Sequence, residues 1–184
     1  MISSLTLMPG TRADGAVSPG GQRTERRFLE FVVDGQRLGQ ILGPFLADDD
    51  ATDEDGDATD EYVPVLVTDW PVGIALEDLD RLLGADAPPS LGGRTALYMC
   101  AECGDLGCGA VTAVVEVDDD KVVWRDFGYQ NDYEPFDQEA VFAGVGPFTF
   151  DRDAYSVVLA HFRSVVSGIP RGPGDVGEPQ SADS

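Results

Sequence analysis

All three cysteines of the chain lie within nine positions, at Cys100, Cys103 and Cys108. They are too close together for a disulfide framework, and their odd number would leave one thiol over. Crowded thiols of this kind are more typical of a metal site or of redox chemistry. We therefore expect a tight turn at this place, with the neighbouring strands arranged around it.

The spacing of the first two cysteines is that of a metal knuckle. In Cys100-x-x-Cys103-Gly104, two thiolates on a tight turn can bind one zinc ion, and the glycine lets the backbone curl beneath it. Cys108 adds a third thiolate, so the spacing equals the first part of a retroviral-type zinc knuckle. The fourth ligand of that motif would fall at Ala113, which has no donor atom in its side chain.

A structural zinc ion requires four ligands in tetrahedral geometry. His161, the only histidine, lies at the border of the apolar face of an expected helix. Asp105, Glu102 and a group from another subunit are the other candidates for the fourth ligand. The candidate zinc site thus consists of the three cysteines with His161 or Asp105. Three reduced thiols that pack in the turn without a metal are the alternative.

A different class of function is thiol redox chemistry by Cys100 and Cys103. In thioredoxin-like enzymes such a pair begins a helix, whereas glycines and a valine-rich segment follow it here, and no βαβ pattern surrounds it. An iron–sulfur cluster would need a fourth ligand, usually cysteine. The glycines are not followed by the lysine of a phosphate loop. We therefore expect a non-catalytic protein, with a thiol oxidoreductase or redox sensor as the alternative.

Apolar and β-branched residues on both sides of the cysteines predict an antiparallel meander from Arg94 to Tyr129. Its strands are expected at residues 94–99, 110–117 and 121–129. An N-terminal hairpin is expected from residues 28–33 and 36–42, because the Asp34-Gly35 dipeptide between them favours the positive φ angles of a two-residue turn. A strand at residues 62–68 should lie at a sheet edge, since it contains Pro64.

Two segments have the spacing of amphipathic helices. The first has leucines at positions 76, 79, 82 and 83 and ends at Gly84. The second follows Asp151, a good N-cap, and places five apolar residues on one face, namely Tyr155, Val158, Leu159, Phe162 and Val166. The expected fold class is therefore α+β, with an antiparallel sheet packed against two helices.

Composition indicates where the chain can form a core. Residues 1–22 and 168–184 are rich in glycine, proline and serine and predict disordered tails. Residues 47–61 hold nine acids and no base and predict a solvated acidic loop. We expect a single α+β domain over residues 23–167, within the usual size range of a domain.

The formal net charge of −22 restricts the partners of this protein. Such a field repels nucleic-acid phosphates and anionic lipid, so neither nucleic acid nor a membrane is expected to bind directly. A basic protein is a better match. No apolar run reaches the roughly 18 residues that span a bilayer, and no secretory pattern is visible. We therefore expect a cytoplasmic protein, in which thiols stay reduced.

Aromatic residues follow the cysteines in the sequence, at Trp124, Phe127, Tyr129, Tyr133 and Phe136. An exposed cluster of this kind could bind a protein partner, although such residues more often cover a sheet edge. With the cysteine turn and the acidity, this pattern favours a non-catalytic interaction module. We expect its partner to be a protein. If the charge of the chain determines the choice of partner, that protein is basic.

Two motifs resemble those of a known group of proteins. They are Tyr98-x-Cys100-x-Glu102-Cys103-Gly104-Asp105-Leu106-Gly107-Cys108-Gly109-Ala110-Val111-Thr112 and Trp124-x-Asp126-Phe127-Gly128-Tyr129. The chain resembles a family of uncharacterised bacterial proteins, mostly from actinobacteria, some labelled only "oxidoreductase". The resemblance extends over residues 82–162. It implies a shared family and no established activity, cofactor or catalytic residue.

Overall fold

The computed structural model describes residues 1–17, 21–46 and 61–168. The predicted acidic loop at 47–61 and the predicted tail at 168–184 therefore lie, except for Glu61 and Gly168, outside the described residues. The described part contains helices and antiparallel sheets, so the α+β fold class is confirmed. None of the helices in this part is long and apolar enough to cross a membrane.

A five-stranded antiparallel sheet contains the predicted meander. In order of pairing, its strands are β10 (Phe148–Asp151), β9 (Lys121–Gln130), β8 (Ala110–Val117), β7 (Thr95–Cys100) and β6 (Tyr62–Pro64). The β-branched and aromatic residues of β8 and β9 suit a pleated, half-buried surface. β6, which contains Pro64, stands last in this order, as expected of a strand in which one residue cannot donate a backbone hydrogen bond.

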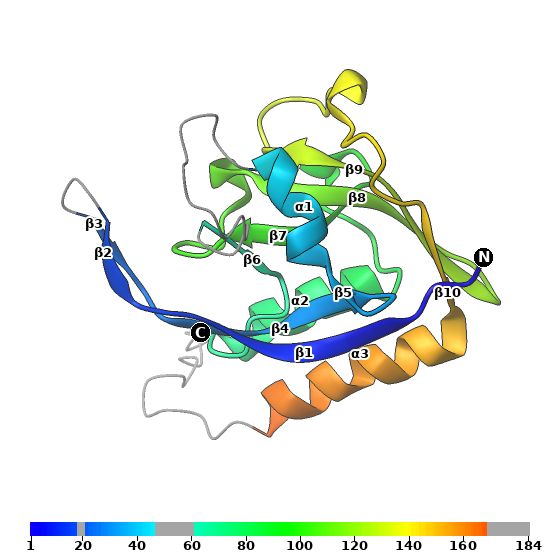
Figure 1. The fold of residues 1–184 in the computed structure, drawn as a ribbon, viewed down its shortest axis with the longest axis horizontal. Coiled ribbons are helices and arrows are strands. Elements are labelled where there is room, and N and C mark those ends of the chain that lie inside the picture. Colours follow the sequence, from blue (N-terminus) through cyan, green and yellow to red (C-terminus); the bar gives the residue numbers. More distant parts are fainter. Residues whose placement is uncertain (18–20, 47–60, 169–184) are drawn as a thin grey trace, which may run out of the picture.

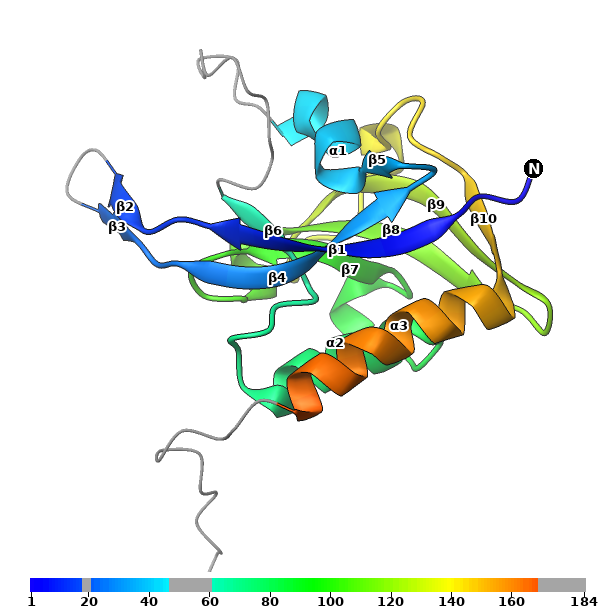
Figure 2. The same cartoon turned by 60° about the horizontal axis from the view of Figure 1, so that its bottom comes forward.

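A second sheet lies across the first (Figures 1 and 2). Its strands are β1 (Leu5–Arg12), β4 (Arg26–Val33) and β5 (Gln36–Arg37), and the short pair β2 (Gly15–Val17) and β3 (Gly21–Arg23) extends β1 and β4 as a ribbon. Ser3 N donates to Thr149 O at 2.6 Å, and Leu29 N donates to Leu66 O at 2.9 Å. The two sheets are thus joined at both ends, and together they curl around one core.

The segment at residues 1–22 differs from the predicted disordered tail, because most of it forms β1 and β2. β1 pairs with β4 without interruption, from Leu5↔Val33 to Arg12↔Arg26. Pro9 and Gly10 give this segment a low local tendency to form a strand. Backbone pairing with β4, and not the local sequence, therefore holds this segment in the strand conformation.

The second strand of the N-terminal hairpin is much shorter than predicted. The Asp34-Gly35 turn is present, with φ angles of 50° and 84°, but β5 has only two residues. The helix α1 (Leu38–Leu46) then replaces the rest of the expected strand at 36–42. Leu38 and Leu42 are four residues apart and both fully buried, so this segment buries its leucines with helical spacing. The described residues therefore contain three α-helices, where two were predicted.

The two predicted helices are present as α2 (Val72–Leu82) and α3 (Arg152–Ser167). Asp151 caps α3 by accepting a hydrogen bond from Ala154 N at 2.9 Å. α2 and α3 lie side by side on one flank of the curled sheets (Figure 2), where Arg163 of α3 pairs with Asp80 of α2 at 2.5 Å. The cysteine turn is at the opposite end of β7 from the loop that follows α2.

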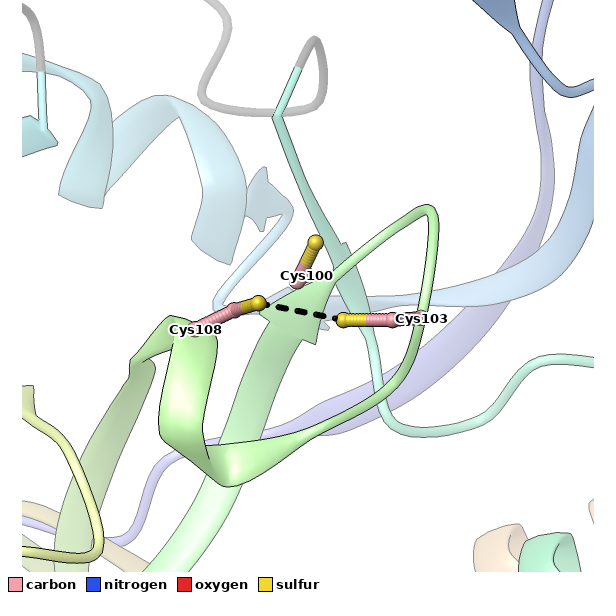
Figure 3. A group of neighbouring side chains, drawn as sticks. All are labelled: Cys100, Cys103 and Cys108. Atoms are coloured by element: carbon pink, nitrogen blue, oxygen red, sulfur yellow. Dashed lines mark hydrogen bonds between the residues drawn. The ribbon is translucent and has the colours of Figure 1, made fainter.

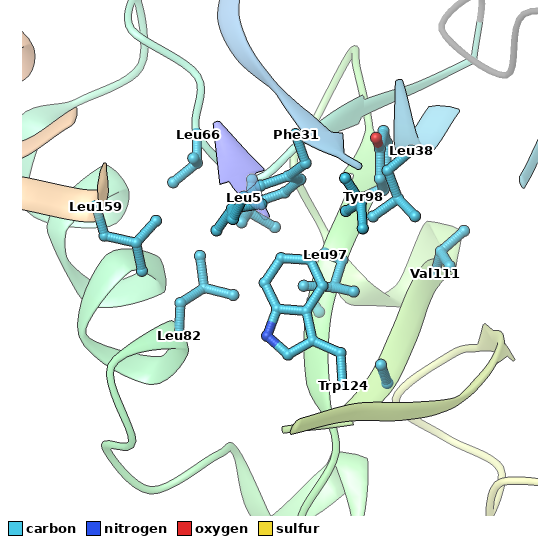
Figure 4. Close-up of a cluster of buried hydrophobic side chains, with 14 of the residues drawn as sticks. Leu5, Phe31, Leu38, Leu66, Leu82, Leu97, Tyr98, Val111, Trp124 and Leu159 are labelled. Carbon is cyan, nitrogen blue, oxygen red and sulfur yellow. The ribbon is translucent and has the colours of Figure 1, made fainter. Parts of the chain in front are cut away.

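Trp124 is at the centre of the core and is fully buried. Its ring centroid lies 5.3 Å from that of Phe31, 5.1 Å from Phe150 and 6.0 Å from Tyr155, all in edge-to-face geometry. Figure 4 shows its indole directed toward Phe31 and Leu82. The indole Nε1 donates to Tyr155 Oη at 3.3 Å, and that hydroxyl donates to Leu82 O at 2.9 Å. The polar atoms of Trp124 and Tyr155 are therefore hydrogen-bonded inside the core.

Asp78 on α2 should make stability depend on pH. It is 4% exposed, and burial raises its pKa from 3.8 to about 6, against the lowering effect of Arg81. A raised pKa favours the protonated carboxyl in the fold, so this contribution is complete below pH 4 and is lost as pH rises through 6. Asp78→Asn should raise the free energy of unfolding by roughly 1–2 kcal/mol at pH 8 and by little at pH 4, measured by urea unfolding.

The matched control is Asp80→Asn, two residues along the same helix, whose side chain is 53% exposed. It breaks an exposed ion pair and should therefore change the free energy of unfolding by less than about 0.5 kcal/mol at either pH. A pH dependence of Asp78→Asn identical to that of Asp80→Asn would show that burial of the Asp78 carboxylate has no energetic effect.

Candidate metal centre

The three cysteines come from a strand end, a turn and a short helix. β7 ends at Cys100, and Gly104, with φ of 63°, turns the chain back as its N–H donates to Cys100 O at 2.9 Å. A 3₁₀ helix, η3 (Leu106–Cys108), then leads into β8. The expected turn between two strands is therefore present, and Cys103 lies at its outer side.

The sulfur atoms of Cys103 and Cys108 point toward each other, and that of Cys100 lies beside them (Figure 3). All three Sγ atoms lie within 4.8 Å of one another, and those of Cys103 and Cys108 are 3.3 Å apart without a disulfide. A tetrahedral zinc ion with bonds of about 2.3 Å holds its thiolate sulfurs about 3.8 Å apart. Cys100 is half-buried, whereas Cys103 and Cys108 are exposed. The triangle thus matches a metal site that opens to solvent.

The ribbon of β1 to β4 holds the first half of the turn. Arg26 Nε donates to Ala101 O at 2.6 Å, and its Nη2 donates to Glu102 O at 3.1 Å. The Glu102 carboxylate accepts hydrogen bonds from Thr24 N at 3.3 Å and from the guanidinium of Arg12. The backbone between Cys100 and Cys103 is therefore fixed from one side by residues more than 70 positions away in the chain.

Two tyrosines hold the second half of the turn. Tyr129 donates to Cys108 O at 3.1 Å, and Tyr133 donates to Gly107 O at 2.7 Å. Gly109 has φ of 91°, and a Cβ built there would lie 1.8 Å from the Tyr129 hydroxyl oxygen. Only glycine permits this approach. The thiols are thus held in position by hydrogen bonds that do not involve sulfur, as expected of a preorganised site.

Arg12 places a buried positive charge beside the turn. Its residue is 5% exposed, Nη2 pairs with Glu102, and Nε and Nη1 have no partner within the described residues. Burial alone would raise the pKa of Glu102, but the hydrogen bonds from Arg12 and Thr24 outweigh it and lower that pKa. Arg12, with Arg26 next to it across the sheet, offsets negative charge that three thiolates would bring.

Tyr62 of β6 lies against the same site, since it pairs with Cys100 across the sheet. Burial raises its pKa strongly, and a hydrogen bond with Tyr129 and the charges of Glu61 and Cys100 add to this effect. The rings of Tyr62 and Tyr129 meet edge to face at 6.1 Å. The Tyr62 hydroxyl is therefore a neutral group beside the thiols.

Of the candidate fourth ligands within this chain, Asp105, Glu102 and His161, none joins the three thiols. Within the described residues, the cluster of donor atoms contains only the three cysteines. The Asp105 carboxylate accepts from Gly107 N at 2.6 Å and so caps η3, and Glu102 is held by Arg12 and Thr24. His161 lies on the exposed side of α3, a helix that packs against α2. The three-cysteine set is thus brought together, whereas His161 and Asp105 remain unsupported as ligands.

The aromatic residues expected to bind a partner divide into two groups. Trp124 and Phe127 are fully buried in the core, so the prediction that they form an exposed cluster is wrong. Both side chains point into the core although they are three positions apart, because the register of β9 against β8 shifts between Arg125 and Gly128. Tyr129 and Tyr133 are 42% and 70% exposed and lie beside the cysteine turn. Of the five aromatic residues named from the sequence, Tyr129 and Tyr133 are thus the two exposed ones, and Phe136 is half-buried.

Comparisons of the chain with protein-family models, with curated proteins and with solved structures give no match. The residues that support the turn, Arg12, Thr24 and Arg26, were not predicted. Arg26 belongs to a basic cluster next to a strand, which is a signal in the sequence, but Arg12 has none.

Glu102→Gln should destabilise the fold, because it leaves the buried Arg12 guanidinium without its counter-charge. Removing one partner of a buried pair costs about 3–5 kcal/mol, and the Glu102 side chain is 42% exposed, so we expect about 2 kcal/mol after screening by solvent. Urea unfolding measures this. Glu25→Gln, which breaks the exposed pair with Arg27, is the control and should cost less than about 0.5 kcal/mol. Equal costs would contradict the buried pair.

Proposed function

We propose that Cys100, Cys103 and Cys108 bind one zinc ion and that the protein is a non-catalytic interaction module whose recognition surface this ion holds in shape. The observation that carries the proposal is the triangle of three sulfurs within 4.8 Å. Zinc prefers thiolates in tetrahedral geometry. The hydrogen-bonded turn already holds three of them close to the separation of about 3.8 Å that tetrahedral zinc requires.

Three ligands leave one coordination position free on the exposed side of the turn, where Cys103 and Cys108 lie. We assign this position to water in the isolated protein and to a side chain of the partner in a complex. A catalytic zinc ion also keeps an open position. A catalytic role would further require a general base close to the ion, and no carboxylate or imidazole within the described residues joins the thiol cluster.

A basic protein is the partner that the charge of the chain favours. The net charge of −22 would attract it over a long range, and the exposed Tyr129 and Tyr133 offer aromatic contacts beside the zinc site. A cytoplasmic location, where thiols stay reduced, would keep the site able to bind metal.

Native mass spectrometry of protein purified without a chelator tests the proposal. We expect one zinc ion per chain and three thiols that react slowly with an alkylating reagent until zinc is removed. Cys103→Ser should lose the ion, because only two thiolates then remain. His161→Gln and Asp105→Asn are matched controls and should keep it. A metal-free protein, or loss of zinc in the His161→Gln variant, would overturn the assignment.

The partner is tested separately with an arginine-rich peptide as the probe. Binding should weaken strongly between about 0.05 M and 0.5 M salt, because exposed charges are screened. Tyr133→Ala should weaken it further, whereas Tyr155→Phe, which changes only a buried hydroxyl, should not. Binding that is insensitive to salt, or no binding at all, would contradict a basic partner.

A thiol redox function has one observation in its favour, the 3.3 Å between the exposed sulfurs of Cys103 and Cys108. This pair differs from the predicted one, Cys100 with Cys103, whose sulfurs also lie within 4.8 Å of each other. In this reaction the two thiols would give two protons and two electrons to a peroxide, forming one disulfide and two waters. Treatment of the isolated protein with peroxide, followed by peptide mapping, tests this function. If the protein is isolated without metal and rapidly forms a disulfide, redox chemistry is favoured. If its thiols are protected from oxidation, zinc binding is favoured.

A further inference from the structure

A groove of about 650 Å³ lies beside the meander, between the turn at residues 89–92, strands β8 and β9, and the loop at residues 132–138. This volume is within the range of small-molecule sites. Its walls combine apolar side chains, among them Val114, Pro135 and Phe136, with a few polar ones. The zinc proposal does not use this groove.

Arg94 forms the floor of the groove and is held rigidly. It is 5% exposed. Its Nε donates to Thr112 Oγ1 at 2.9 Å, and its Nη2 donates to Thr112 O at 3.0 Å and to Asp126 O. The ring of Phe136 covers one face of the guanidinium, 3.5 Å from its carbon. An arginine fixed in this way loses little entropy when it binds a ligand.

The third nitrogen of Arg94, Nη1, has no hydrogen-bond partner among the described residues and is not sealed from solvent. The same is true of Nε2 of Gln130, a residue 4% exposed whose Oε1 accepts from Thr112 Oγ1 at 3.2 Å. Both side chains therefore contact one hydroxyl, and both line the groove. Two free N–H donors on buried, fixed side chains thus lie on the same wall.

We propose that this groove binds a small organic acid with one carboxylate and an apolar body. The carboxylate accepts hydrogen bonds from Arg94 Nη1 and Gln130 Nε2, the bidentate geometry that a guanidinium and an amide favour. The apolar body lies against Val114, Pro135 and Phe136. Both donors are open to solvent, and their side chains are already fixed by hydrogen bonds to Thr112, so the carboxylate replaces water at little cost in side-chain entropy.

The charges at the rim favour a single carboxylate over a phosphate. Asp126, Asp132 and Glu134 also line the groove, and each repels a dianion more strongly than a monoanion. Arg125, at the same rim, is already paired with Glu116 at 2.6 Å and with Asp126. Burial lowers the pKa of Arg94 to about 10, so its guanidinium stays charged at neutral pH.

NMR titration of the full-length, ¹⁵N-labelled protein tests the proposal. The probe is 3-phenylpropanoate, and 3-phenyl-1-propanol is the uncharged match of the same length. The acid should shift the side-chain amide signals of Gln130 and the Nε–H signal of Arg94, with a dissociation constant on the order of 1 mM. The alcohol should bind about tenfold more weakly or not at all. Equal binding of acid and alcohol, or no shift with the acid, would overturn the proposal.

Gln130→Glu sharpens the test, since it replaces the amide donor with a repelling carboxylate of the same shape. It should weaken binding of the acid by about tenfold or more. Gln36→Glu, which adds the same charge at an exposed position of β5, should leave the affinity unchanged. If Gln130→Glu does not fold, Gln130→Leu takes its place. Unchanged affinity in a folded Gln130 variant, or tighter binding of phenyl phosphate than of the acid, would contradict a carboxylate site. Loss of zinc should not alter any of these results.

Discussion

Zinc at about a thousandfold excess over its dissociation constant should raise the free energy of unfolding by about 4 kcal/mol. The reason is linkage: three sulfurs within 4.8 Å of one another exist only in the folded chain, so the free energy of binding adds to that of folding. Urea unfolding of the metal-free protein, with and without buffered zinc, measures the gain. We expect the midpoint to move to higher urea with little change of slope.

Variants of the candidate ligands and a metal that prefers oxygen test whether the gain in free energy of unfolding arises at the thiols. A Cys103→Ser, Cys108→Ser double variant should lose most of it, because one thiolate alone cannot compete with water for zinc. His161→Gln should retain it. Magnesium, which prefers oxygen ligands, should give no gain. The same stabilisation in the double variant, or with magnesium, would mean that the cation binds the acidic surface and not the thiols.

The parts of the fold that were predicted correctly have a strong local pattern. The meander from Arg94 to Tyr129 has β-branched residues and short polar turns, and α3 has both helical spacing and the Asp151 cap. In these segments the local preference and the tertiary structure agree. The cysteine turn belongs to this group too, because its three thiols are close in sequence.

The parts that differ from the prediction depend on contacts between distant residues. β1 contains Pro9 and Gly10 and forms because β4 lies beside it. In α1, Leu38 and Leu42 are inward-facing in a helix although the segment follows a hairpin turn. Tertiary packing overrides a weak local signal in both cases.

The candidate site shows the same division. The sequence identifies the thiols that could bind a metal, but not the residues whose hydrogen bonds fix the turn that carries these thiols. Arg12 and Arg26 reach the turn from about 75 to 90 positions away, and nothing in one sequence marks such a contact. Along β9, spacing alone does not reveal which residues face inward, because bulges shift the register between β8 and β9.

Trp124→Ala should cost about 4 kcal/mol of unfolding free energy. The indole is fully buried and contacts three other rings, and truncation of a buried large aromatic leaves a cavity that rigid neighbours cannot fill. The change also removes the donor to Tyr155 Oη. Since this is a large fraction of the stability of an ordinary domain, we expect a poorly folded variant, and Trp124→Phe should recover part of the loss. Urea unfolding measures both.

Tyr133→Ala is the matched comparison, because Tyr133 follows Trp124 by nine positions and was expected to share its role. Its side chain is 70% exposed, and its one hydrogen bond, to Gly107 O, contributes about 1 kcal/mol. This variant should therefore stay folded while it loses affinity for the arginine-rich peptide. A Trp124→Ala protein of unchanged stability, or a Tyr133→Ala protein that unfolds, would reverse the assignment of core to β9 and of surface to the loop that follows it. The two variants together thus separate the residue that builds the fold from the residue open to a partner.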